Sequence, residues 1–213
     1  MLYPDFKKIC RNRPFITSKD IIVPEKERQG LRNQLGRWEK KGLIIQLKRG
    51  VYLLNEDERS IHPSRFFIAN QLYGPSYVSL EYALNYYDLI PEKVVVVTSI
   101  TTKKTKVFEN AMGKFTYQHL QPRAFRGFRA IKDDAGFSFF MADPEKAIVD
   151  FVYLNLPRFK VGDTDIFEES YRYQNLEQLK LAKLNDAASY FQSHKLTRIV
   201  EDFCQLLKKR GNR

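Results

Sequence analysis

The chain has 213 residues, of which 43% are hydrophobic and 14% aromatic, and its formal net charge is +11 at pH 7. This composition excludes an intrinsically disordered chain, and the length suffices for one substantial core or two smaller ones. No apolar run approaches the roughly 20 residues that a membrane span requires, and the first residues lack a secretory signal pattern. We therefore expect a cytoplasmic protein that meets no membrane.

The basic charge is concentrated in two blocks. Residues 1–55 hold 13 Lys and Arg against 5 Asp and Glu, and residues 100–129 hold 7 against 1. Such blocks are typical of proteins that bind a polyanion, because each neutralised phosphate releases condensed counterions. A solvated basic surface without a partner gives the same pattern, and for the second block alone we favour that simpler interpretation.

Two helices are predicted before residue 25. Residues 3–10 form the first, and a short second helix begins at Thr17 or Ser18, whose side chains can cap a helix N-terminus. This second helix is expected to run through Ile22 and to end at Pro24. Cys10 and Cys204 are isolated from each other in sequence, so we expect two half-buried small hydrophobes rather than a disulfide or a metal pair.

Residues 27–41 predict an amphipathic helix. Leu31, Leu35 and Trp38 recur at the spacing of one helical face, while the opposite face is polar and mostly basic. Gly42 is expected to end the helix, because glycine reaches the left-handed conformation beyond a helix C-terminus without steric strain.

A tight β-hairpin is predicted directly after this helix. Its strands cover residues 43–47 and 51–54, and its tip is Lys48-Arg49-Gly50, with Gly50 at positive φ. Helix, short helix, recognition helix and two-stranded wing together have the layout of a winged helix-turn-helix. We expect this domain to occupy residues 1–58 and to lie in the major groove of double-stranded DNA.

Several polar side chains of this domain suit DNA. The forked groups of Arg, Asn and Gln match guanine and adenine edges, whereas other contacts go to the phosphate backbone. The base-edge or phosphate candidates on the helix are Arg28, Gln29, Arg32, Asn33 and Arg37. The candidates for holding the backbone are Ser18, Lys19, Lys48 and Arg49. A basic surface helix without a partner is the alternative, and the basic hairpin that follows argues against it.

The acidic residues 56–58 mark a boundary, and residues 59–213 are predicted to form a second domain. It is mixed α+β, with a small antiparallel sheet and terminal helices, so the whole chain is of the α+β class. Helices are expected over 64–73 and 80–87, the latter capped by Ser79. The expected strands cover residues 94–100, 113–120, 127–132 and 136–141.

A further helix is predicted to open at Asp143-Pro144-Glu145, as N-cap, first-turn proline and first-turn acid. The apolar stripe of this helix includes Ile148 and Phe151. The chain from residue 166 onward is also helical in pattern. The fold class is therefore set by helices arranged around a small sheet.

Signals of catalysis are weak. The three histidines are scattered, no nucleophile or phosphate-loop motif is present, and we expect no enzyme, no metal and no cofactor. A divalent-metal nuclease using Asp134 or Asp143 with Glu145 is the alternative. We favour local structural roles for these acids, and also for Asp133, Asp150 and the adjacent Lys146. These roles are to form a turn, to cap a helix or to lie on an exposed helix face.

Two further motifs have both simple and functional interpretations. The stretch 125–129, FRGFR, can stack on single-stranded bases, although a strand with one apolar face is the simpler source of the pattern. The polar loop 101–106 either is solvated or forms a second phosphate contact or a patch for an acidic partner. The residues of this second basic surface are Thr101, Thr102, Lys103, Lys104 and Lys106.

An ordered set of stretches resembles the AbiEi antitoxin family of abortive-infection systems. The stretches are Thr17-Ser18-Lys19-Asp20, Trp38 to Ile44 into Arg49-Gly50-Val51-Tyr52, Tyr77 to Leu84, Leu89-Ile90-Pro91-Glu92, Val97 to Lys104 and Asp143 to Ala147. The resemblance runs from about residue 14 to about residue 155, and the chain after about residue 160 matches less well. The resemblance implies a winged-helix domain that represses its own operon. It also implies a C-terminal domain that neutralises a nucleotidyltransferase-like toxin encoded beside it, without a stable complex.

We therefore expect a DNA-binding antitoxin and autorepressor of a type IV toxin–antitoxin system. It would bind its operator as a dimer, because one helix-turn-helix module buries too little surface for tight specific binding. A stand-alone winged-helix transcriptional regulator is one alternative. A protein-interaction module without a DNA role, which binds an acidic partner through residues 101–106, is another.

Overall fold

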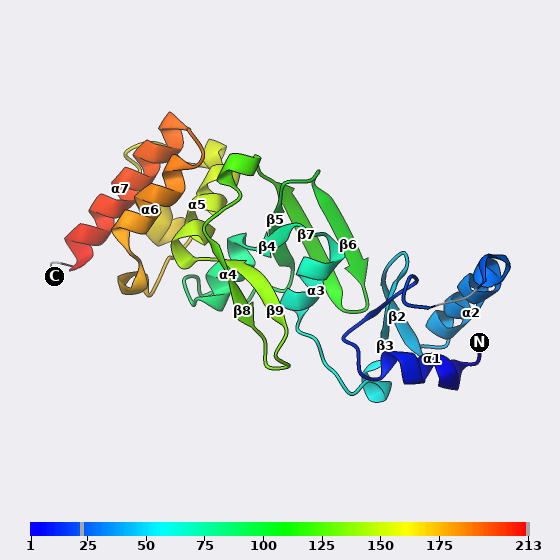
Figure 1. The fold of residues 1–213 in the computed structure, drawn as a ribbon. Coiled ribbons are helices and arrows are strands. Elements are labelled where there is room, and N and C mark those ends of the chain that lie inside the picture. Colours follow the sequence, from blue (N-terminus) through cyan, green and yellow to red (C-terminus); the bar gives the residue numbers. More distant parts are fainter. Residues whose placement is uncertain (22–23, 212–213) are drawn as a thin grey trace.

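The N-terminal elements are small and lie at one end of an elongated molecule (Figure 1). The computed structural model describes residues 1–21 and 24–211. A three-stranded antiparallel sheet of order β1-β3-β2 is flanked by helices. The elements are α1 (Tyr3–Cys10), β1 (Ile16–Thr17), the 3₁₀ turn η1 (Glu25–Glu27), α2 (Arg28–Lys40), β2 (Ile44–Lys48) and β3 (Val51–Leu54).

The apolar stripe of α2 packs inward, as predicted. Leu31 and Leu35 are buried, and the Trp38 ring lies 5.1 Å from the Phe6 ring and 5.4 Å from the Tyr3 ring of α1. Gly42 follows the helix at φ +69°, which confirms the predicted stop. This packing turns the opposite, polar face of α2 toward solvent.

The short helix expected from Thr17 or Ser18 through Ile22 is absent from the described residues 17–21. Thr17 instead ends strand β1 and pairs with Val51, and residues 18–20 form a turn. The Asp20 carboxylate accepts hydrogen bonds from the Thr17 backbone N–H and hydroxyl, both at 2.7 Å. This local closure competes with a helix start, and the third strand of the small sheet is the result. Ile22 lies outside the described residues.

A six-stranded mixed sheet, of order β6-β7-β5-β4-β9-β8, forms the centre of the molecule. Strand β5 runs parallel to β7, and β4 runs parallel to β9, so the expectation of a wholly antiparallel sheet here was wrong. The expected strands formed, but β4 and β6 were not predicted. The strands are β4 (Ser76–Val78), β5 (Val97–Thr101), β6 (Lys106–Asn110), β7 (Gly113–His119), β8 (Phe128–Lys132) and β9 (Ser138–Ala142).

Helices cover this sheet and extend to the far end of the molecule (Figure 1). The Ser64 hydroxyl caps α3 by accepting from the Phe67 N–H at 3.2 Å. Asp143 and Pro144 stand at the start of α5 as predicted, but the Asp143 side chain makes no capping hydrogen bond. No described helix is both long and apolar enough to cross a membrane. The helical elements are η2 (Glu56–Glu58), α3 (Arg65–Leu72), α4 (Leu80–Tyr86), η3 (Pro122–Ala124), α5 (Pro144–Leu154), η4 (Leu156–Arg158), the π-helical η5 (Ile166–Ser170), η6 (Leu176–Gln178), α6 (Leu181–Ser189) and α7 (His194–Gly211).

The buried apolar residues of the described chain fall into two clusters. The smaller one joins α1, α2 and the three-stranded sheet, and the larger one contains the six-stranded sheet and the helices after it. Leu47 and Leu53 of the hairpin belong to the larger cluster, so the hairpin packs on both sides. Cys10 and Cys204 are buried, and burial raises the pKa of the Cys10 thiol to about 12. The division into domains 1–58 and 59–213 stays a prediction.

A charged cluster lies where α5 meets β4, and it corrects two predictions. Glu145, Lys146 and Asp150 are buried instead of lying on an exposed helix face. The Ser79 hydroxyl does not cap α4 but donates to the Asp150 carboxylate at 2.8 Å. Tyr77 donates to the same oxygen at 2.9 Å, and Lys146 bonds the other oxygen.

This carboxylate is satisfied by three donors. Burial raises the pKa of the Asp150 carboxyl, while Lys146, Ser79 and Tyr77 oppose the rise by stabilising the anion. A buried ion pair persists only when its hydrogen-bonding capacity is met in this way. The cluster therefore ties α5 to the sheet.

Removing one charge of this pair should destabilise the fold. We expect Lys146→Met to lower the free energy of unfolding by about 3–5 kcal/mol, because Asp150 would stay buried without its cation. Glu92→Gln is the control, because it breaks an exposed ion pair with Arg172 and should change stability by less than about 1 kcal/mol. Urea denaturation measures both, and equal losses would contradict the prediction.

Candidate nucleic-acid interface

A basic groove of about 860 Å³ runs between α2 and the tip of the β2–β3 hairpin. Five of the nine residues predicted to contact DNA line it, and apolar side chains form its floor. The polar lining residues are Ser18, Lys19, Arg28, Arg32 and Arg49. The remaining lining residues are Ile21, Leu31, Leu35, Gly50 and Tyr52. The structure thus brings together residues from three separate stretches of sequence.

The helix periodicity explains which of its polar residues face this groove. Arg28 and Arg32 are four residues apart and therefore share one face of α2. Gln29 and Asn33 lie on the outermost face, where the Gln29 amide donates to the Asn33 side chain at 3.2 Å. Arg37 is exposed but lies five residues after Arg32, about 140° further around the helix. Arg37 is therefore apart from the groove.

The far wall of the groove is a pair of connected turns. Gly50 has φ +79°, as predicted for the hairpin tip, and its carbonyl accepts from the Ser18 N–H at 2.8 Å. The hydrogen bonds from Thr17 lower the pKa of the Asp20 carboxyl, so this carboxylate is charged at neutral pH and holds the turn that presents Ser18 and Lys19. Arg49 is exposed beside them.

Lys48 makes a contact that the sequence did not predict. Its ammonium donates to the Leu72 carbonyl at 2.6 Å, at the C-terminal end of α3, instead of projecting from the hairpin tip. Burial and the nearby Lys103 both lower its pKa. Free carbonyls at a helix C-terminus attract cations, which accounts for this position. Lys48 thus anchors the hairpin to the central sheet and its helix.

The second basic surface is smaller than predicted. Thr101 is buried, and its hydroxyl donates to the Pro75 carbonyl at 2.7 Å, so it is not a surface residue. Lys103 donates to the Gly74 carbonyl. Thr102 is half-buried, and Lys104 and Lys106 are exposed. This loop adjoins the end of α3 that Lys48 also contacts, so the two basic blocks of the sequence come close together in space.

Several of the acids considered for a nuclease already have local partners. Asp133 closes its turn by accepting from Phe137, Asp143 lies near Arg129 and Lys183, and Glu145 accepts from the backbone of Lys180. Within residues 1–21 and 24–211 no three His, Cys, Asp or Glu side chains are grouped so that they could hold a metal ion.

Residues 125–129, FRGFR, lead into strand β8, and their phenylalanines form an apolar face. The Phe128 ring stacks on the Tyr77 ring at 4.5 Å, and the Phe125 ring lies 5.1 Å from it. Arg126 lies over the Tyr190 ring. Both phenylalanines are half-buried, as the simpler interpretation predicts.

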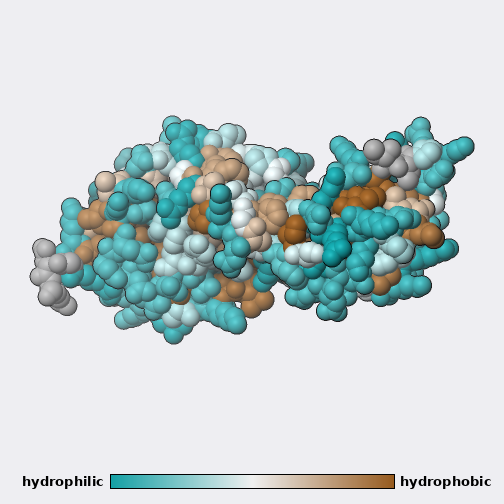
Figure 2. All heavy atoms as spheres, turned by 60° about the horizontal axis from the view of Figure 1, so that its bottom comes forward, coloured by the Kyte–Doolittle hydropathy of each residue, from teal (hydrophilic) through white to brown (hydrophobic). Residues whose placement is uncertain are grey.

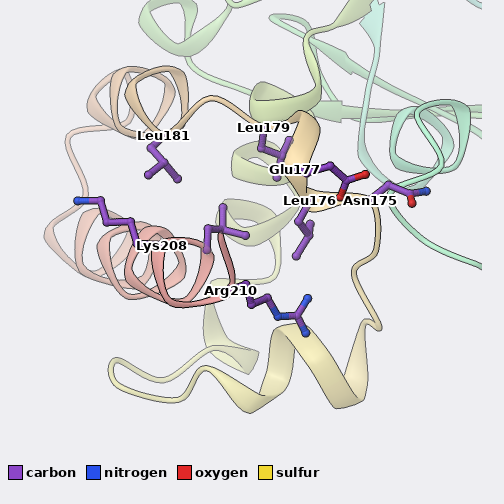
Figure 3. Close-up of a pocket in the computed structure, with 8 residues that line it drawn as sticks. Asn175, Leu176, Glu177, Leu179, Leu181, Lys208 and Arg210 are labelled. Carbon is purple, nitrogen blue, oxygen red and sulfur yellow. The ribbon is translucent and has the colours of Figure 1, made fainter. Parts of the chain in front are cut away.

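A separate cavity of about 760 Å³ lies between η6 and the C-terminal end of α7 (Figure 3). Leucines surround it, while the charged ends of Glu177 and Lys208 point away from them. Arg210 turns toward η5, where it pairs with Glu168. The cavity therefore lacks the converging polar groups of a ligand site.

The sequence did not reveal the floor of the groove. Ile21 and Tyr52 line it, and neither was among the predicted residues. All four residues of β3 are apolar, so its sequence gives no alternation from which the direction of Tyr52 could be predicted. The face drawn in Figure 2 is mostly hydrophilic, with one group of apolar residues on the N-terminal part at the right and further groups over the rest of the molecule.

Comparison with models of known protein families and with curated proteins gives no match for this chain.

Two glycines test the local geometry of the groove. Gly50→Ala should destabilise the protein by about 1–2 kcal/mol, because φ +79° strains an L-residue and the new Cβ would lie 3.0 Å from Ser18 Oγ. Gly30→Ala in α2 meets nothing within 4 Å and should stabilise it by about 0.5–1 kcal/mol. Thermal unfolding measures the stability of both variants relative to the parent protein. An unchanged stability of Gly50→Ala would contradict the prediction that the hairpin tip is strained in any residue but glycine.

Proposed function

We propose that this protein binds double-stranded DNA through α2 and the hairpin, as a winged helix-turn-helix does. The observation that carries the proposal is the groove, where Arg28, Arg32, Arg49 and Lys19 meet from three segments while the leucines of α2 pack inward. An outward basic helix with Asn and Gln among its arginines has the side chains that read base edges. A basic hairpin tip beside it suits phosphate.

The groove suggests how the contacts are divided. Gln29 and Asn33, on the outermost face of α2, are placed to reach base edges. Arg28 and Arg32 face the hairpin side, where the phosphate backbone would pass, and Arg49 holds the same backbone from the opposite wall. Lys48 contributes indirectly, because its bond to Leu72 fixes the angle of the hairpin. Two copies would be needed on a repeated operator, since one module buries little surface.

We propose further that the protein is the antitoxin of a type IV toxin–antitoxin system and represses its own operon. Support comes from the resemblance to the AbiEi family over residues 14 to 155. The chain after β3 would counter a nucleotidyltransferase-like toxin without a stable complex, with no catalytic step of its own. A stand-alone regulator would share the DNA-binding groove and lack the partner toxin.

Operator binding should depend on the groove. Arg28→Ala combined with Arg32→Ala should weaken binding to the region upstream of the gene by roughly 10-fold or more, because two cations that face the phosphate backbone are lost. A plot of the logarithm of the affinity against the logarithm of the salt concentration should also be less steep for this variant than for the parent. Its slope should decrease in magnitude by about 0.9 for each phosphate that is no longer neutralised. Gel shift at several salt concentrations measures both effects.

The matched control is Arg158→Ala combined with Lys160→Ala, which removes the same charge from exposed positions near the far end of the molecule. Operator affinity of this control should stay within about 2-fold of the parent protein. If both double variants bind equally well, α2 is not the DNA-binding helix.

Antitoxin activity should depend on the second basic surface if that surface meets an acidic partner. Lys104→Glu combined with Lys106→Glu is the sharpest variant, because both side chains are exposed whereas Lys103 supports the Gly74 turn. We expect growth to stop in cells that express the neighbouring toxin gene, with operator binding within about 3-fold of the parent. Lys132→Glu combined with Lys160→Glu is the control, and full protection by the first variant would exclude this surface.

A further inference from the structure

A narrow slot of about 290 Å³ lies where β4 and β9 diverge. These parallel strands are paired only at Val78 and Met141. Before that point the Asn70 side chain, from α3, bonds the backbone N–H and carbonyl of Phe140, in place of a neighbouring strand. Asn70 thus satisfies the edge of β9 and leaves a gap between the strands.

Aromatic rings form one side of the slot. Phe125, Phe128 and Phe140 line it, and Tyr77 supports Phe128 from behind by stacking at 4.5 Å with an interplanar angle of 17°. Phe140 meets Phe128 edge to face at 5.6 Å and is 48% exposed, so about half of its surface is available to a ligand. Such rings accept a planar partner by offset or edge contacts.

A buried hydroxyl lines the same slot. Ser76 is 5% exposed, and its Oγ has no hydrogen-bond partner among the described residues. A buried polar group without a partner costs free energy, and native structures satisfy the great majority of them. A ligand with a ring nitrogen or exocyclic oxygen in the slot would satisfy Ser76. The Ser138 and Gln71 side chains, both exposed at the rim, offer further polar groups.

Cations flank the opening. Gly74 and Gln71 line the slot, and their carbonyls accept from Lys103 and Lys48 respectively. Lys104 is exposed on the same loop as Lys103. An anionic group attached to the planar ligand would therefore meet positive charge just outside the aromatic wall.

We propose that this slot binds a nucleobase, stacked against Phe140 and Phe125 with its polar edge on Ser76 and its phosphate toward Lys103 and Lys104. The volume lies at the lower end of the range for small-molecule sites, which suits one planar ring system. The base would belong either to a free nucleotide or to an unpaired position of single-stranded RNA. This site is separate from the groove beside α2 and does not depend on the proposed operator binding.

Calorimetric titration of the full chain with ATP, UTP, a pentameric oligoadenylate RNA and inorganic tripolyphosphate tests the slot. We expect the base-containing ligands to bind more tightly than tripolyphosphate. Phe140→Ala should weaken them about 5- to 100-fold, as removal of one base–aromatic stack does. Ser76→Ala should weaken them less and change the preference between bases. A mononucleotide as tight as the pentamer would identify a nucleotide site, and a tighter pentamer would identify a single-stranded RNA site.

The control is Tyr86→Ala, which removes an aromatic ring of 43% exposure that does not line the slot. Its nucleotide affinity should equal that of the parent, and operator gel shift should be unchanged in every variant. The proposal is overturned if no base-containing ligand binds at millimolar concentration, if tripolyphosphate binds as tightly as ATP, or if Phe140→Ala leaves the affinities unchanged.

Discussion

The arrangement of the central sheet depends on one buried carboxylate. Asp150 projects from α5 and accepts hydrogen bonds from Tyr77 and Ser79 of the β4 segment and from Lys146 one turn earlier. A charge this deep is tolerated only with all of these donors, so the register of β4 against α5 is fixed. Gly127 completes the fit, because a Cβ there would lie 3.1 Å from Lys146 Cγ. Strand β8 therefore begins directly against the ion pair.

The hairpin is held to this sheet by polar contacts near its tip. The Asn110 amide donates to the Leu47 carbonyl at 2.9 Å, and Lys48 donates to the end of α3. Leu47 and Leu53 add apolar contact with the larger core. The orientation of the groove beside α2 is thus linked to the sheet, which gives the second basic loop a fixed position relative to this groove.

Local patterns predicted much of this fold. The stripe of Leu31 and Leu35, the stop at Gly42 and the turn at Gly50 each depend on neighbours in sequence, and each formed as expected. The short helix at Ser18 failed because Asp20 closes a turn on Thr17, and the parallel strand pairs depend on partners distant in sequence. Alternation of side chains alone cannot set the direction of a neighbouring strand.

The candidate sites show the same limit. Residues on α2 could be assigned to an outward face by periodicity. The contact of Lys48 with the Leu72 carbonyl was not predicted, because the two residues lie 24 positions apart in the sequence. Asp150 and Lys146 resemble a surface ion pair at helical spacing, and only the packing of α4, α6 and β4 around α5 buries them. Residues 125–129 suggested base stacking, and two of their phenylalanines line the slot at Ser76. The slot itself could not be anticipated, since it arises where two strands separate.

The approach of β2 to β6 has a consequence for the sheet itself. β6 is an outer strand of the six-stranded sheet, and Val107 on it is 50% exposed. An open outer strand with apolar side chains is a template for pairing with other chains, and natural proteins cover such edges. Asn110 and Leu47 join the hairpin to the end of this strand. A fragment beginning after the hairpin would leave this end of the strand uncovered as well, and we expect it to aggregate more readily than the whole chain.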